Sequence, residues 1–188
     1  MTGGYVSPSC TNSSCVENYD GSSWSTGTAM ITNRNNASLS GTQDCILAIS
    51  GKNPTAQLST EEWNGSAWSV SGNVIVARQD AGFTGKGTST TGAIFGGEDV
   101  DSTNINCTEL FNAVCSTTMC SALGTWSAAA SMINSRYSQG YSPSGTQNAA
   151  LASGGYPGAS VLTATEEYDG TSWSAGGALT EGKWLVGS

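Results

Sequence analysis

The residues best suited to chemistry in this sequence are two pairs of neighbouring acids, Glu61-Glu62 and Glu166-Glu167. A pair of carboxylates flanking one bond is the usual machinery of glycoside hydrolysis. Consecutive residues of a strand face opposite sides, however, so neighbouring acids cannot converge on one bond. The sequence also has no histidine, which excludes Ser-His-Asp and Cys-His nucleophiles and His-ligated metals. We therefore expect a protein without enzymatic activity or a cofactor.

The densest acidic stretch is Glu98-Asp99-Val100-Asp101, in which Glu98, Asp99 and Asp101 form a weak candidate for calcium binding. A solvated acidic loop is the favoured interpretation, because the stretch lacks the glycine and the distal glutamate of an EF-hand loop. The whole chain has 6 Lys and Arg against 14 Asp and Glu, a formal net charge of −8. This balance argues against nucleic acid as a partner, and no apolar run is long enough to insert in a membrane.

The elements that must position these residues come from an internal repeat. Four segments each carry two aromatic residues, and the second aromatic recurs at intervals of 44, 58 and 47 residues. A basic residue follows each segment and recurs at the same intervals. The paired aromatics are Tyr19 and Trp24, Trp63 and Trp68, Phe111 and Trp126, and Tyr168 and Trp173. The basic residues are Arg34, Arg78, Arg136 and Lys183. We interpret the aromatics as packing anchors, and we expect each basic residue to form an ion pair with a repeated glutamate.

Each repeat predicts four antiparallel strands. Asp-Gly and Asn-Gly pairs such as Asp20-Gly21 predict hairpins with type I′ turns, which need positive φ at both central residues. A buried strand precedes each hairpin at Ile46–Ile49, Ala93–Phe95 and Ala149–Ala152. A further strand is expected near each basic residue. Four strands per unit of roughly 44 to 58 residues are typical of the blades of a β-propeller.

The repeat resembles the kelch repeat, in which an apolar strand ending in Gly-Gly is followed by Tyr and then Trp. Thr165-Glu-Glu-Tyr-Asp-Gly-Thr-Ser-Trp-Ser174 is more similar to the kelch-like "EEYDGTSW" repeats of predicted tail-fibre and appendage proteins of bacteriophages. The resemblance covers nearly the whole chain and implies an all-β, kelch-like propeller of about four four-stranded blades. It also implies a virion or extracellular location.

One propeller domain is expected over residues 1–188, with units at about 1–28, 29–72, 73–128 and 129–176 and a closing strand segment at 177–188. The terminal segments are expected to share one blade, or to leave it incomplete. Three arrangements stay open: a four-bladed ring with one thin blade, a fragment of a longer propeller, or copies that share a ring or exchange strands.

The cysteines predict an oxidising compartment. Cys10 with Cys15 and Cys115 with Cys120 are candidates for short-loop disulfides, and Cys107 is a candidate to join either loop. Cys45 is expected to be a free apolar residue within a buried strand. Reduced thiols throughout are the alternative.

Ligand contacts are expected from residues that are less periodic than the repeat anchors, although Tyr156 shares its repeat position with Tyr5. The candidates lie on or beside an insertion at 113–123 and near Gly-rich loops, and they are Asn112, Thr117, Thr118, Tyr141, Tyr156 and Trp184. We expect a structural or recognition module of a phage tail fibre or similar appendage, which contacts a host-surface glycan, other virion proteins or copies of itself. The alternative is a secreted or cell-surface adhesin, or a self-assembling extracellular filament subunit.

Overall fold

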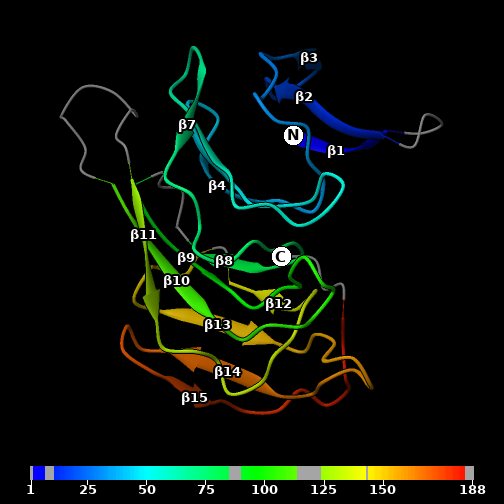
Figure 1. The fold of residues 1–188 in the computed structure, drawn as a ribbon, viewed down its shortest axis with the longest axis vertical. Helices are drawn as coiled ribbons and strands as arrows, with labels where there is room; N and C mark the ends of the chain where they lie inside the picture. The colour runs from blue at the N-terminus through cyan, green and yellow to red at the C-terminus, as the bar shows by residue number, and fades with distance from the viewer. Residues whose placement is uncertain (1, 7–10, 85–89, 114–123, 143, 185–188) are drawn as a thin grey trace.

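A computed structural model describes residues 2–6, 11–84, 90–113, 124–142 and 144–184. These residues form four antiparallel sheets, and the described part of the chain contains no helix (Figure 1). The prediction of an all-β chain is therefore confirmed. In particular, the described residues include no helix that could cross a membrane.

The first sheet has three strands and the other three sheets have four each, always paired in the order of the chain. The first sheet consists of β1 (Thr2–Val6), β2 (Thr11–Tyr19) and β3 (Trp24–Thr26). The second consists of β4 (Ser38–Thr42), β5 (Cys45–Ile49), β6 (Thr60–Trp63) and β7 (Trp68–Ser71). The third consists of β8 (Gly82–Thr84), β9 (Thr91–Phe95), β10 (Thr108–Asn112) and β11 (Thr125–Ala129). The fourth consists of β12 (Gly140–Tyr141), β13 (Ala150–Ser153), β14 (Thr165–Tyr168) and β15 (Trp173–Ala175).

The Asp-Gly and Asn-Gly pairs lie at hairpin tips, as predicted. Tyr19 pairs with Trp24 across the first tip, and the other tips repeat this register. The predicted turn type is wrong, because Asp20, Asn64 and Asp169 do not have positive φ and the loops contain four residues. Each Asp or Asn side chain instead accepts two backbone N–H groups, as Asp20 Oδ1 does from Ser22 and Ser23, both at 2.8 Å. An Asx turn therefore closes each hairpin.

The apolar cores lie between successive sheets. One cluster joins Leu47 and Ile49 of the second sheet to Phe83, Phe111 and Trp126 of the third. A second cluster joins residues of the first unit to the second sheet. A third cluster joins the third sheet to the fourth. The first strands of neighbouring sheets are also in contact, β4 with β8 and β8 with β12, and Figure 1 shows β8 and β12 near the middle of the molecule. Each sheet is thus covered by its neighbours in the repeat, which is a blade-like arrangement.

The first sheet differs from the others because β1 begins where the second strand of a complete sheet ends, since Thr2 pairs with Val16 as Ile49 pairs with Thr60. Its Gly3 has the same positive φ, near 60°, as Ser50, Gly96 and Gly154, which follow β5, β9 and β13. Among the described residues, β1 is paired with β2 only. The described strands therefore do not form the expected terminal blade, and the sheets show a blade-like series without a closed ring.

The predicted cysteine pairing is wrong where the structure describes it. Cys15 and Cys107 are free thiols, so neither the bridge from Cys10 to Cys15 nor one from Cys107 is formed. Cys45 is disulfide-bonded, which corrects the expectation of a free thiol in β5. The candidates Cys10, Cys115 and Cys120 lie outside the described residues.

Candidate functional site

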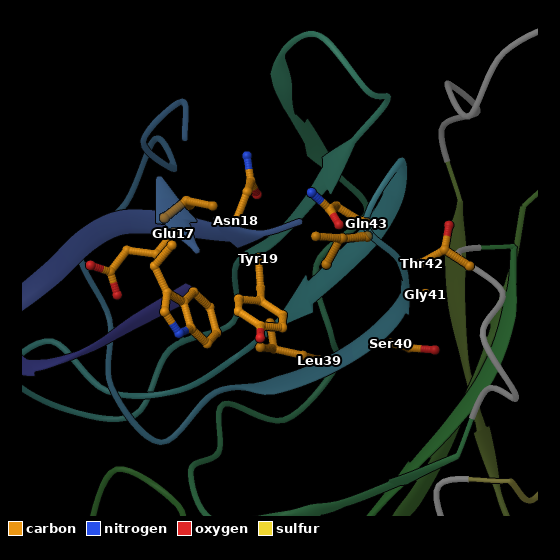
Figure 2. A pocket seen from close by; sticks show the side chains of 11 residues that line it. Glu17, Asn18, Tyr19, Leu39, Ser40, Gly41, Thr42 and Gln43 are labelled. Atoms are coloured by element: carbon orange, nitrogen blue, oxygen red, sulfur yellow. The ribbon is translucent and has the colours of Figure 1, made fainter. Parts of the chain in front are cut away.

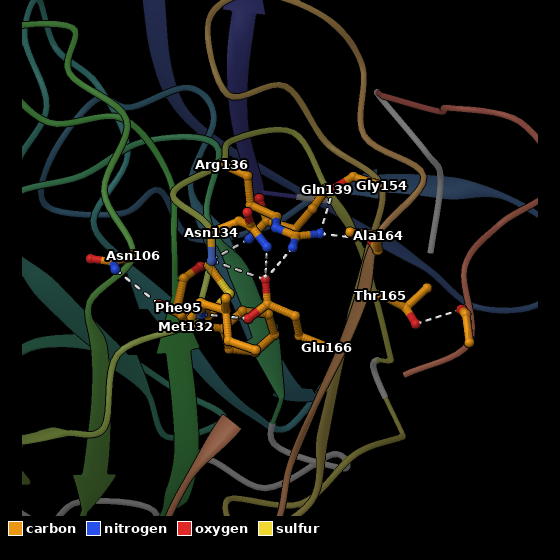
Figure 3. A network of polar contacts seen from close by, with 12 residues as sticks. Phe95, Asn106, Met132, Asn134, Arg136, Gln139, Gly154, Ala164, Thr165 and Glu166 are labelled. Carbon is orange, nitrogen blue, oxygen red and sulfur yellow. Dashed lines mark hydrogen bonds and ion pairs between the residues drawn. The ribbon is translucent and has the colours of Figure 1, made fainter. Parts of the chain in front are cut away.

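Three buried ion pairs connect the sheets, and they confirm most of the predicted pairing of repeated charges. Arg34 pairs with Glu61, Arg78 with Glu109 and Arg136 with Glu166, and all six side chains are almost fully buried. Each arginine also donates to two backbone carbonyls of the sheet that follows it, as Arg136 does to Gly154 at 2.8 Å and Ala164 at 2.9 Å (Figure 3). We call each such set an Arg–Glu junction.

The glutamate of a junction also binds the loop that leads from the preceding sheet to its own sheet. Glu166 accepts the N–H of Ile133 at 2.6 Å and that of Asn134 at 3.1 Å, and Glu61 and Glu109 repeat these contacts. Burial lowers the pKa of Arg136 from its ordinary value, and the charge of Glu166 opposes that change. Each buried carboxylate thus has several donors, which satisfies its hydrogen-bonding demand, whereas the Nε atoms of Arg34 and Arg136 have no partner among the described residues. These acids are therefore structural.

Lys183 departs from the predicted pairing. It occupies the repeat position of the arginines but pairs with Glu181 at 2.7 Å, two residues away, and its side chain is 55% exposed. No sheet follows it among the described residues, so it has no buried glutamate to meet.

The candidate site is a row of three aromatic side chains, Tyr137, Tyr156 and Trp184. The ring centroids of Tyr137 and Tyr156 are 5.8 Å apart and nearly perpendicular, and those of Tyr156 and Trp184 are 5.6 Å apart at 41°. Trp184 is 48% exposed, and the two tyrosines are half-buried. Tyr156 and Trp184 were both predicted as ligand contacts, and the structure brings them together.

The aromatic row has aromatic side chains where two equivalent bridges have polar ones. Tyr137, which precedes β12, and Tyr156, which follows β13, form a backbone bridge, and the equivalent bridges join Asn35 to Lys52 and Gln79 to Glu98. Two of the three bridges thus form between residues with polar side chains. The aromatic side chains at the third are not required by the backbone arrangement, which makes them candidates for binding.

Carboxylates lie close to this row. The pKa of the Tyr137 hydroxyl is raised by desolvation and then by the negative charges of Glu98 and Asp80. Burial also raises the pKa of Asp80, although a hydrogen bond from Asn36 at 3.0 Å opposes this effect. Glu98 accepts a hydrogen bond from the Gln79 amide. The neighbourhood therefore combines exposed ring surface with hydrogen-bond acceptors and a negative potential.

A second aromatic region, the hairpin recess, lies where the tip of the first sheet meets β4 and β5. Tyr19, Trp24, Leu39 and Ile46 contribute its apolar lining, with Asn18 and Gln43 among its polar residues, around a volume of about 300 Å³ (Figure 2). Tyr19 and Trp24 are periodic repeat residues, and their counterparts in the fourth sheet are buried. The exposure of this pair therefore reflects its place at the end of the repeat.

The other predicted residues do not join the aromatic row. Tyr141 lies on β12 and packs against the core between the third and fourth sheets, and Asn112 lies at the exposed end of β10. Thr117 and Thr118 lie outside the described residues. Asp99 accepts the N–H groups of Asp101 and Thr103 in its own turn. Because no three acids or cysteines of the described chain converge, the calcium candidate Glu98, Asp99 and Asp101 is not supported.

Tyr137 is the residue that sequence reasoning missed. It directly follows Arg136, at the position that Trp184 occupies after Lys183. Comparing the residues one place after each repeated basic residue would have found it, because Asn35 and Gln79 are polar whereas Tyr137 and Trp184 are aromatic.

Comparison with known proteins adds no relative: neither a protein family nor a curated protein matches this sequence.

Proposed function

We propose that this chain is a non-enzymatic recognition module of a phage virion appendage and that its aromatic row binds a neutral saccharide. The carrying observation is the stack of Tyr156 on Trp184, 5.6 Å apart, where the bridges of Asn35 with Lys52 and of Gln79 with Glu98 carry polar side chains. Sugar rings present C–H groups that pack on the faces of aromatic rings, because the quadrupole of each ring makes its face partially negative.

The polar surroundings favour an uncharged sugar. Carboxylates accept hydrogen bonds from hydroxyl groups, and Glu98 and Asp80 are close enough to Tyr137 to raise its pKa. The net charge of −8 would repel acidic sugars such as sialic acids. The expected ligand is therefore a neutral oligosaccharide.

The scaffold supports recognition at this place. Successive sheets are fixed to one another by buried Arg–Glu junctions, so the aromatic row is carried on rigid elements. The resemblance of Thr165–Ser174 to kelch-like repeats of phage appendage proteins supports propeller blades and the assignment to a virion, and both are part of this proposal.

The test is a printed array of neutral and sialylated oligosaccharides probed with the purified chain. We expect binding to neutral glycans, reduced about tenfold or more by Trp184→Ala or Tyr156→Ala, because stacking surface is lost. Tyr19→Ala, which removes an exposed aromatic of the hairpin recess, is the matched control and should bind as the parent does. Binding restricted to sialylated glycans, or binding unchanged by both row variants, would contradict the proposal.

A further inference from the structure

We propose that this chain associates end to end with a second copy of itself, the segment 177–184 of one copy docking on the first sheet of the next. The contact would be a fourth Arg–Glu junction, with Lys183 in the place of the arginine and Glu17 in the place of the glutamate. This inference concerns different residues from the saccharide proposal and does not depend on it.

The backbone of segment 177–184 makes the same hydrogen bonds as the corresponding segments within the chain. The N–H of Leu179 donates to the carbonyl of Thr163 at 2.8 Å, as the N–H of Met132 does to Asn106 at 2.8 Å. The N–H of Lys183 donates to Leu162 at 3.3 Å, as that of Arg136 does to Ile105 at 3.3 Å. The same two bonds occur at Met30 and Arg34 and at Val74 and Arg78. The segment is therefore preorganised for the contact that its counterparts make.

The side of this segment that would face the next unit is only partly covered. Met30, Val74 and Met132 are buried, whereas Leu179 is only half-buried. At the internal junctions, the two N–H groups after these residues donate to a glutamate of the following sheet. In the part of the chain that the structure describes, the equivalent N–H groups, those of Thr180 and Glu181, have no such acceptor.

The first sheet presents the complementary half. Glu17 is exposed and occupies the register position of the buried Glu61 and Glu166, since each lies two residues before the aromatic that closes its hairpin. Trp24 is 57% exposed, whereas Trp68, Trp126 and Trp173 are at most 9% exposed. Trp68 is covered by the preceding unit, where its Nε1 donates to the carbonyl of Thr28 at 2.9 Å.

A second copy fits these two faces best because the required contact occurs three times within the chain. The charges are complementary, Lys183 on one face and Glu17 on the other, and apolar Leu179 would meet apolar Trp24 as Met30 meets Trp68. The two faces differ, so the association is head to tail, and it produces a ring or an open filament according to the angle between copies.

Sedimentation velocity of the whole chain over a concentration series tests the proposal. We expect the mean sedimentation coefficient to rise with concentration. Lys183→Glu and Glu17→Lys should each weaken association about tenfold or more, because like charges then meet in a desolvated contact. The double variant carrying both exchanges should recover association, and so should an equimolar mixture of the two single variants.

Glu167→Lys, the same charge change at an exposed glutamate of the fourth sheet, is the matched control and should associate as the parent does. A monomer at every concentration would overturn the proposal. So would association that neither charge reversal weakens, or weakening that the double variant does not reverse.

Discussion

The first and fourth sheets carry nearly the same hairpin in different surroundings. Glu17-Asn-Tyr-Asp-Gly-Ser-Ser-Trp24 and Glu166-Glu-Tyr-Asp-Gly-Thr-Ser-Trp173 fold with the same register and the same capped tip. The third sheet covers the second of these hairpins, so Trp173 is 8% exposed and Glu166 is paired with Arg136. The corresponding Trp24 and Glu17 are exposed. The motif thus determines the hairpin, whereas the neighbouring unit determines what the motif contributes to stability.

The largest expected difference concerns the glutamates. Glu166→Gln leaves the buried Arg136 without its counter-charge, and we expect a loss of about 3–5 kcal/mol in the free energy of unfolding. Glu17→Gln changes an exposed side chain and should cost about 0–1 kcal/mol. Urea unfolding followed by tryptophan fluorescence measures both values. Equal losses would show that the contribution of this glutamate to stability does not depend on its burial.

The tryptophans should differ somewhat less. Trp173 packs edge-on against Phe95 with centroids 5.0 Å apart, and its Nε1 donates to Thr108 at 2.9 Å. We expect Trp173→Ala to destabilise the chain by about 3 kcal/mol. Trp24→Ala should cost about 1 kcal/mol or less in dilute protein, because most of its surface is already in water. A comparable loss in the two variants, measured by the same unfolding experiment, would contradict the comparison.

The glycines of the two tips should behave alike. Gly21 has a φ of 101° and Gly170 a φ of 97°, a backbone conformation that disfavours any side chain. An added Cβ meets nothing within 4 Å at Gly21 and only ordinary or slightly close contacts with Asn148 at Gly170. We expect Gly21→Ala and Gly170→Ala each to cost about 1 kcal/mol through the backbone alone. Widely different urea midpoints for the two variants would show that the stability of each tip depends on its surroundings.

The smallest effect is a pH dependence shared by both tips. Hydrogen bonds from Ser172 and Thr171 lower the pKa of Asp169 from 3.8 to about 2, and similar bonds from Ser23 and Ser22 lower that of Asp20. The ionised side chain therefore stabilises its hairpin tip above about pH 4, and this contribution is lost as the pH falls through the lowered pKa. We expect carboxyl titrations by NMR to place both midpoints below 3.8, with Asp169→Asn retaining the cap at low pH. A midpoint at the ordinary value for either residue would remove the proposed cap there.

Much of this architecture could be predicted from the sequence because the repeat keeps one register. The buried strands, the hairpin tips and three of the four charge pairs follow from residues such as Arg78 and Glu109, which recur at equivalent positions. The turn type was wrong because the side chain of Asp20 supplies hydrogen bonds that a four-residue loop needs and a two-residue turn does not. The exposure of Trp24 could not be predicted, because it depends on a neighbour rather than on the local sequence.

The candidate site was only half predictable for a related reason. Tyr156 and Trp184 lie beside Gly-rich loops and could be singled out, but their meeting with Tyr137 depends on a backbone bridge and ring contacts between segments that are separated in sequence. Cys15 and Cys107 show the reverse case, since a suggestive spacing in the chain did not bring two sulfur atoms together.

The carboxylates that accept N–H groups from the preceding loop have one more consequence. Because Glu166 holds Ile133 and Asn134, each unit is stabilised by the unit after it, so a unit inside the series cannot melt without weakening another. The chain should then lose structure in the manner of a one-dimensional array, by fraying inward from its ends. Amide hydrogen exchange would be fastest in the outermost units and slowest where two intact neighbours meet.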